Sequence, residues 1–144
     1  MYIDIHTDLI INLPSVDVEL VKSRNFTVVV DGVNSTGGLA VPNLLKKLGV
    51  NIIELYCNPN GEFPHNPEPL KENLTDLSKL VIKEKADLGI VVDPDVDRLA
   101  LVSENGEVFG EEYTLVACAD YFLKNNPGNT VSNLSSSRAL KDLS

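Results

Sequence analysis

The order strand, helix, strand over residues 26–56 constrains the fold of this chain more than any other feature. Residues 26–30 are apolar and mostly β-branched, residues 39–48 suit a helix that ends before Gly49, and residues 51–56 suit a second strand. Glycine is favoured directly after a helix because it tolerates positive φ there. Two strands linked through one helix at this spacing form a βαβ unit and lie parallel in one sheet. The sequence therefore predicts an α/β fold.

Three further runs extend the predicted sheet. Residues 87–92 are apolar almost throughout, which indicates a strand buried on both faces and hence a central position. Residues 99–102 and 108–109 suit two short strands joined by a tight turn at Asn105-Gly106, a dipeptide that favours hairpins. The expected architecture is a three-layer α/β/α fold with a mixed, mainly parallel sheet and one short antiparallel hairpin.

Two other segments predict helices that cover the sheet. One begins at Pro69 and places four apolar residues on one face, namely Leu70, Leu74, Leu77 and Val81. Residues 113–123 are apolar on nearly all sides, which predicts a helix buried on more than one side. Residues 130–134 suit a last short strand, and the beginning of a helix follows it.

Composition narrows the classes of partner. The 144 residues include 21 acidic and 12 basic side chains, which gives a net charge of −9. A nucleic-acid partner needs a basic surface, and the sequence shows none. No apolar run approaches the roughly 20 residues that cross a bilayer, and no signal-peptide pattern opens the chain, so no membrane partner is expected. Cys57 and Cys118 form no disulfide or zinc pattern, which favours a reducing, cytoplasmic setting.

Three aspartates alternate directly after the predicted central strand: Asp93, Asp95 and Asp97. Alternate side chains of an extended or looped backbone face one side, so the three carboxylates can converge. Carboxylates held that closely repel one another unless a cation lies among them. Hard oxygen ligands suit Mg²⁺ best, with Mn²⁺ or Ca²⁺ as alternatives. The place is favourable, because open α/β sheets bind ligands beyond the carboxyl ends of their strands, and Arg98 adds a planar cation that suits phosphate.

Two other interpretations of this loop stay open. Aspartate and proline favour turns, so the segment also suits a solvated acidic turn. A calcium loop of the EF-hand kind would use the aspartates at its first, third and fifth positions and Glu104 at its twelfth. That loop needs glycine at its sixth position, where this chain has Arg98.

Polar residues outside the loop are expected to have local roles. Ser35 or Thr36 should cap the helix that follows the glycine-containing turn at residues 34–38, although a phosphate cradle at that helix start is the alternative. His65 lies in a proline-rich segment and is expected to be exposed or locally bonded, with proton transfer as the alternative.

The motifs, taken in order, resemble those of the α-D-phosphohexomutases, the family of phosphoglucomutase, phosphomannomutase and phosphoglucosamine mutase. Asp93-Pro94-Asp95-Val96-Asp97-Arg98 resembles the D-G/P-D-x-D-R metal loop of that family. The other matches are residues 29–38 (strand and glycine turn opening the second domain), 63–70 (F-x-x-x-P-E-P-L), 86–90 (A-D-L-G-I), 110–112 (the turn before the next helix), and Ser135-Ser136 with 138–140 (the start of the third domain). The resemblance covers the chain from about Val28 to the C-terminus.

This resemblance implies an enzyme that moves a phosphoryl group between the 6- and 1-positions of a hexose phosphate through a bisphosphorylated intermediate. Such enzymes have four domains, of which the first carries a phosphoserine that donates the phosphoryl group and the second holds Mg²⁺. By the resemblance, Asp93, Asp95 and Asp97 are the metal ligands, and Arg98 orients or neutralises the phosphoserine. The nucleophilic serine and the sugar-binding loops have no counterpart in this chain. The isolated chain is therefore expected to bind metal weakly and to be inactive.

The resemblance also sets expectations for substrate and domain limits. Glucosamine phosphate is the favoured substrate, with mannose or glucose phosphate next, and the partners are this hexose phosphate and the other domains of the same protein. Residues 1–25 suit a linker or helix from a preceding domain, residues 26–128 the metal-binding α/β domain, and residues 129–144 the beginning of a following domain or a C-terminal strand and helix. The chain then looks like a fragment. A non-enzymatic metal-binding or interaction module on the same scaffold is the alternative function.

Overall fold

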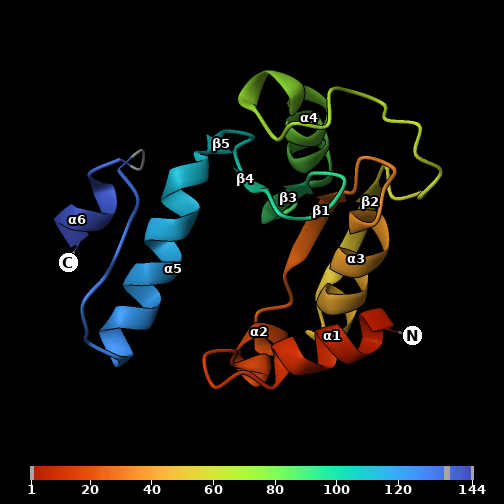
Figure 1. The fold of residues 1–144 in the computed structure, drawn as a ribbon. Helices are drawn as coiled ribbons and strands as arrows, with labels where there is room; N and C mark the ends of the chain where they lie inside the picture. Colours follow the sequence, from red (N-terminus) through yellow and green to blue (C-terminus); the bar gives the residue numbers. More distant parts are fainter. Residues whose placement is uncertain (1, 135–136, 144) are drawn as a thin grey trace. The chain divides into compact units, whose positions relative to one another are not determined.

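A mixed five-stranded sheet forms the centre of the fold (Figure 1). The computed structural model describes residues 2–134 and 137–143, with the side chains of Glu111 and Glu112 left out, so the predicted Ser135-Ser136 motif lies outside the described residues. The strands lie in the order β2-β1-β3-β4-β5. Their bounds are β1 Thr27–Asp31, β2 Asn51–Leu55, β3 Leu88–Val92, β4 Leu99–Ser103 and β5 Val108–Phe109.

Six α-helices and one 3₁₀ helix accompany the strands in the described part of the chain. Their bounds are α1 Tyr2–Ile11, α2 Val18–Ser23, α3 Gly37–Lys47, the 3₁₀ helix η1 Lys71–Asn73, α4 Thr75–Glu84, α5 Glu111–Asn125 and α6 Ala139–Leu143. By packing, the chain divides into two compact units, Met1–Val108 and Phe109–Ser144. The domain limits expected after residues 25 and 128 stay a prediction.

The pairing of the strands confirms the predicted α/β fold. β1 pairs in parallel with β2 across the crossover helix α3, and also in parallel with β3, which lies in the middle of the sheet. β3 and β4 are antiparallel, with Val92 opposite Leu99. The sequence predicted one antiparallel hairpin at residues 99–109, and the structure adds the β3–β4 pair before it.

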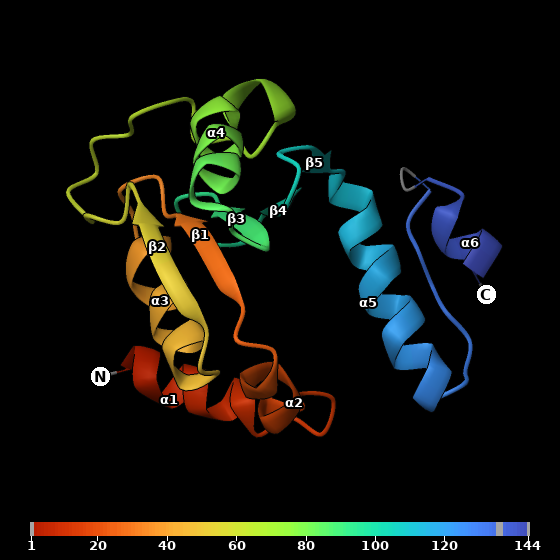
Figure 2. The same cartoon turned by 180° about the vertical axis from the view of Figure 1, so that it is seen from behind.

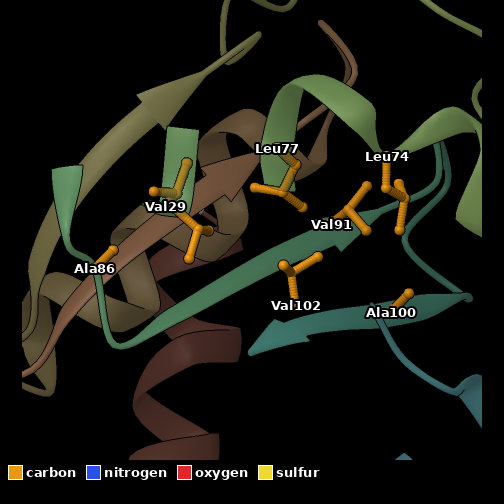
Figure 3. Packing of buried hydrophobic residues seen from close by; sticks show 8 residues of the cluster. Val29, Leu74, Leu77, Ala86, Val91, Ala100 and Val102 are labelled. Carbon is orange, nitrogen blue, oxygen red and sulfur yellow. The ribbon is translucent and has the colours of Figure 1, made fainter. Parts of the chain in front are cut away.

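Residues that alternate along β1 build two cores on opposite faces of the sheet. Val29 faces α4, and this core also contains Leu74, Leu77, Ala86, Val91, Ala100 and Val102 (Figure 3). Val28 and Val30 face the other way and pack with Leu45 of α3 and with Val50. Because side chains of a strand alternate between faces, one run of valines serves both cores. The result is the expected three layers, with α3 and α4 on opposite sides of the sheet.

The first helix is anchored by polar contacts. α1 packs against α3, as Figure 2 shows from behind. Lys47 of α3 donates hydrogen bonds to the Thr7 hydroxyl (2.8 Å) and to the Asp8 carboxylate (2.6 Å).

No helix in the described part of the chain is long and apolar enough to span a membrane.

Three expectations about helices and strands are corrected. The helix predicted from Pro69 begins as α4 at Thr75, after η1, so Leu70 stays 42% exposed instead of joining the core. Residues 130–134 form no strand, because a strand needs a neighbour to pair its backbone groups and the described part of the second unit offers none. Helix α5 forms as predicted, but it is not buried on more than one side, because several of its apolar side chains are exposed, including Tyr113, Leu115 and Phe122.

Cys57, just after β2, is a partly buried thiol that bonds to the backbone. Its Sγ donates to the carbonyl oxygens of Val30 and Leu55, each at 3.4 Å. Burial, with a smaller contribution from Glu54, raises the pKa of the Cys57 thiol from 9.0 to about 11. Cys118, in contrast, is exposed on α5.

The two cysteines should therefore differ in reactivity. Two pKa units correspond to about 100-fold less thiolate, so at pH 8 iodoacetamide should modify Cys57 at least about 100-fold more slowly in the folded chain than in urea. In the folded chain the Cys57 rate should keep rising with pH to about 11, where the thiol ionises. Peptide mass spectrometry over time measures both rates, with Cys118 as the accessible reference. Equal modification of the two thiols without urea would contradict this assignment.

Candidate metal centre

Two buried carboxylates lie at the carboxyl edge of the sheet. Asp31 ends β1 and Asp93 follows β3 directly, and these neighbouring strands are parallel. Asp31 is 1% exposed and Asp93 is 2% exposed. Charged groups are rarely so buried without partners, so each carboxylate must be bonded by its surroundings. This is the edge at which the sequence predicted a ligand site.

The aspartate loop at residues 93–98 is the connection of the β3–β4 hairpin. The backbone N–H of Asp93 donates to the carbonyl oxygen of Arg98 (3.3 Å), so the two ends of the loop close on each other. Val96, with φ +66°, takes a left-handed conformation that β-branched residues seldom adopt, and its N–H donates to the Asp93 carbonyl oxygen (3.1 Å). The loop is therefore a tight turn of defined shape.

The structure brings Asp93, Asp95 and Asp97 together. One carboxylate oxygen from each lies within 4.8 Å of the others, and Asp95 and Asp97 are exposed while Asp93 is buried. Opposite ligands of an octahedral Mg²⁺ lie about 4.2 Å apart. Three carboxylate oxygens gathered this closely suit a hard divalent cation. Among the side chains that the structure describes, this is the only such group of three.

Asp93 is fixed by three hydrogen bonds from its own loop. Its Oδ1 accepts from the backbone N–H groups of Asp97 (3.1 Å) and Arg98 (3.0 Å), and its Oδ2 accepts from Arg98 Nε (3.1 Å). Burial alone would raise the pKa of Asp93, but the Arg98 backbone N–H, the neighbouring Asp97 and Asp95 and the Arg98 charge together lower it. Repulsion from Asp95, and then Asp93, raises the pKa of Asp97. The loop thus carries more negative charge than Arg98 balances.

The glycine turn after β1 supports the loop from the side. Ser35 Oγ donates to the carbonyl oxygen of Pro94 (2.9 Å). Thr36 stands at the N-cap of α3 without a capping side-chain hydrogen bond. The predicted helix cap at Ser35 or Thr36 is therefore wrong, because Ser35 bonds to the aspartate loop instead.

The proline-rich segment at residues 58–69 supplies a second partner for Arg98. Figure 2 shows this irregular segment running from the end of β2 towards η1 and α4. Glu68 Oε2 lies 2.7 Å from Arg98 Nη1, and this pairing, ahead of the Asp93 contact, raises the pKa of Arg98. The guanidinium of Arg98, for which the sequence predicted a phosphate partner, is thus held between Glu68 and Asp93.

His65 of the same segment bonds to the buried Asp31. Nε2 lies 2.9 Å from Asp31 Oδ2, and Nδ1 lies 2.7 Å from the carbonyl oxygen of Asn66. Burial raises the pKa of Asp31, although the Val33 N–H and His65 partly offset this. The expected local bond of His65 is present, but the bond to Asp31 was missed. An aspartate closing a buried strand beside the predicted site was the signal that could have indicated it.

The fold and the loop define a class: a three-layer α/β/α domain with a tri-aspartate turn at the carboxyl edge of its sheet. Residues 4–106 match the family model described as phosphoglucomutase/phosphomannomutase, alpha/beta/alpha domain II. The chain belongs to the phosphoglucomutase/phosphomannomutase family, as its second domain.

Individual relatives agree with this family. A phosphoglucomutase/phosphomannomutase of Thermococcus kodakarensis is 38% identical over 130 residues, covering 89% of this chain and 28% of the relative. A protein of Pyrococcus abyssi named "Probable phosphoglucosamine mutase" is 38% identical over 125 residues, covering 86% of this chain and 28% of the relative. A crystal structure of a phosphoglucomutase/phosphomannomutase family protein from Burkholderia thailandensis superposes with a TM-score of 0.70 at 29% identity, covering 88% of this chain and 30% of that one. The chain thus spans less than a third of the length of these relatives.

Proposed function

We propose that this chain supplies the divalent-metal loop of a phosphohexomutase, an intramolecular phosphotransferase of the isomerase class. One observation carries the proposal: a second domain of this family places an oxygen of Asp93, of Asp95 and of Asp97 within 4.8 Å of one another. In this proposal the three aspartates hold Mg²⁺, or Mn²⁺ in its place. The bound ion supplies positive charge to the oxygens of the transferring phosphoryl group.

The protein groups of the loop have separate parts in this function. Asp93 is fixed by hydrogen bonds before any ion arrives, so it acts as the rigid ligand. The exposed Asp95 and Asp97 would supply the other two carboxylate ligands. Arg98 faces the same loop and directs its remaining N–H groups to the phosphoserine or phosphate, for which a planar guanidinium is well suited.

The proposed substrate is a hexose phosphate. Glucosamine phosphate is favoured, which agrees with the name of the Pyrococcus abyssi relative, and mannose or glucose phosphate comes next, as in the name of the Thermococcus kodakarensis relative. With a net charge of −9, this chain repels a phosphate unless cations come from the ion and from other domains of the enzyme. The serine that carries the phosphoryl group belongs to another domain in this proposal. The setting is the reducing cytoplasm expected from the cysteines.

Metal binding to the chain itself tests the proposal. Titration with Mn²⁺, followed by electron paramagnetic resonance, should show one saturable site for which Mg²⁺ competes. Loss of a residue that supports a metal ligand lowers metal affinity about 10–100-fold. Asp95→Asn removes a proposed ligand, so it should lower Mn²⁺ affinity by at least this factor. Glu104→Gln is the matched control, because Glu104 would be a ligand only in a calcium loop of the EF-hand kind. Absence of saturable binding at millimolar metal, or unchanged binding by Asp95→Asn, would overturn the proposal.

A further inference from the structure

Asp93 has little acceptor capacity left for an ion. A carboxylate offers about four lone-pair positions on its two oxygens. The backbone N–H groups of Asp97 and Arg98 occupy both positions on Oδ1, and Arg98 Nε occupies one on Oδ2. One position on Oδ2 therefore remains, and it lies beside the guanidinium. The orientation of Arg98 decides whether that position is open.

Arg98 is able to close over this position. A guanidinium prefers to pair with carboxylates through two parallel N–H bonds, and Arg98 already lies near both Asp93 Oδ2 (3.1 Å) and Asp97 Oδ1 (3.7 Å). In the structure it contacts both through Nε, while Nη1 is turned towards Glu68 at 2.7 Å. Glu68 thus competes with the aspartates for the same guanidinium.

Glu68 is itself held in place by its surroundings. Its backbone N–H donates to Asn66 Oδ1 (3.2 Å), and its carbonyl oxygen accepts from Asn73 Nδ2 (2.8 Å). Three residues earlier, His65 anchors the segment to the buried Asp31 at the carboxyl end of β1. A side chain on a segment fixed at these points presents its carboxylate from one direction, which a mobile loop would not do.

We propose that Glu68 is a positioning residue that turns Nη1 of Arg98 away from Asp93 and so keeps the last acceptor position of Asp93 open for the divalent ion. This inference rests on the proposed function, since it assumes that the ion binds at the aspartate loop. It assigns the proline-rich segment a role in metal affinity, and it predicts that Glu68 and Arg98 act as one unit.

A double-mutant cycle tests this unit. Glu68→Ala should weaken Mn²⁺ binding about tenfold, as expected when residues in contact are uncoupled. Glu62→Ala, which removes the same charge from the same segment, should weaken it less than about twofold. In an Arg98→Met chain, Glu68→Ala should lower Mn²⁺ affinity no more than Glu62→Ala does, because no guanidinium remains to close over Asp93. The Arg98 Nε–H NMR signal should shift in Glu68→Ala without metal and stay unchanged in Glu62→Ala.

The outcomes separate the two proposals. If the unmodified chain shows no saturable Mn²⁺ site, the proposed function fails. If the site is present but Glu68→Ala binds as Glu62→Ala does, or loses as much affinity in the Arg98→Met chain, the role of Glu68 is overturned. Glu68 is half exposed, so its variants should keep the melting temperature of the parent chain within a few degrees. Glu68→Gln, which keeps a hydrogen-bond acceptor, should recover part of the lost affinity.

Discussion

Asp93→Ala should lower the free energy of unfolding by about 2–4 kcal/mol and abolish metal binding together. The carboxylate is buried and accepts three hydrogen bonds, so alanine leaves the N–H groups of Asp97 and Arg98 without their acceptor inside the β3–β4 turn. Urea unfolding followed by circular dichroism measures the first effect, and Mn²⁺ titration measures the second.

Asp93→Asn separates the two roles of this side chain. Its amide oxygen can still accept from both backbone N–H groups, so most of the stability should remain, with a loss of about 1 kcal/mol. Asparagine lacks the negative charge of aspartate, so Mn²⁺ binding should be much weaker than in the parent chain. If Asp93→Asn bound Mn²⁺ as the parent chain does, Asp93 would be a structural residue of the turn and not a ligand.

Gly38→Ala should be the most destabilising substitution at the start of α3 and should lower the free energy of unfolding by about 3 kcal/mol. A Cβ at this position would lie 2.7 Å from both the Cα and the carbonyl oxygen of Cys57. These are backbone atoms, so no side-chain rotation relieves the overlap, and α3 must move away from the end of β2. Urea unfolding of the variant measures the cost.

Gly61→Ala provides the comparison for Gly38. Gly61 has φ +78°, but no atom lies within 4 Å of its virtual Cβ. Gly61→Ala should lower the free energy of unfolding by only roughly 1 kcal/mol, which is the cost of a positive φ for a residue with a side chain. If Gly38→Ala lost no more unfolding free energy than Gly61→Ala, the steric cost assigned to the contact between α3 and Cys57 would be contradicted.

Local patterns were enough to predict the sheet. The valine run at β1 and the apolar run at β3 are continuous and bounded by polar residues, so the type of both strands, and the central position of β3, followed from residue character alone. The boundaries were less accurate. Pro69 appeared to be a helix start, but the chain forms η1 before α4, and this moves Leu70 out of the core. A short 3₁₀ turn and an α-helical turn have similar sequences, so packing decides between them.

The site was only partly accessible to the same reasoning. Asp93, Asp95 and Asp97 are near one another in the chain, and their convergence could be predicted from spacing. Their role as ligands stays a prediction until metal binding is measured. The contacts from Glu68 to Arg98 and from His65 to Asp31 join residues 30 and 34 positions apart, and only the folded chain brings such pairs together. Ser35 was misassigned for the same reason, since its partner Pro94 lies 59 positions away.

The β3–β4 pairing limits how this loop can change over evolution. Val92 faces Leu99 and Val91 faces Ala100, which places Ala100 and Val102 in the core beneath α4. Adding or deleting one residue between Val92 and Leu99 would turn every side chain of β4 to the opposite face. We therefore expect related domains to keep six residues between these strands, because the packing of β4 in the core fixes the length of the turn. The residue types at positions 94 and 96 should vary freely within that length.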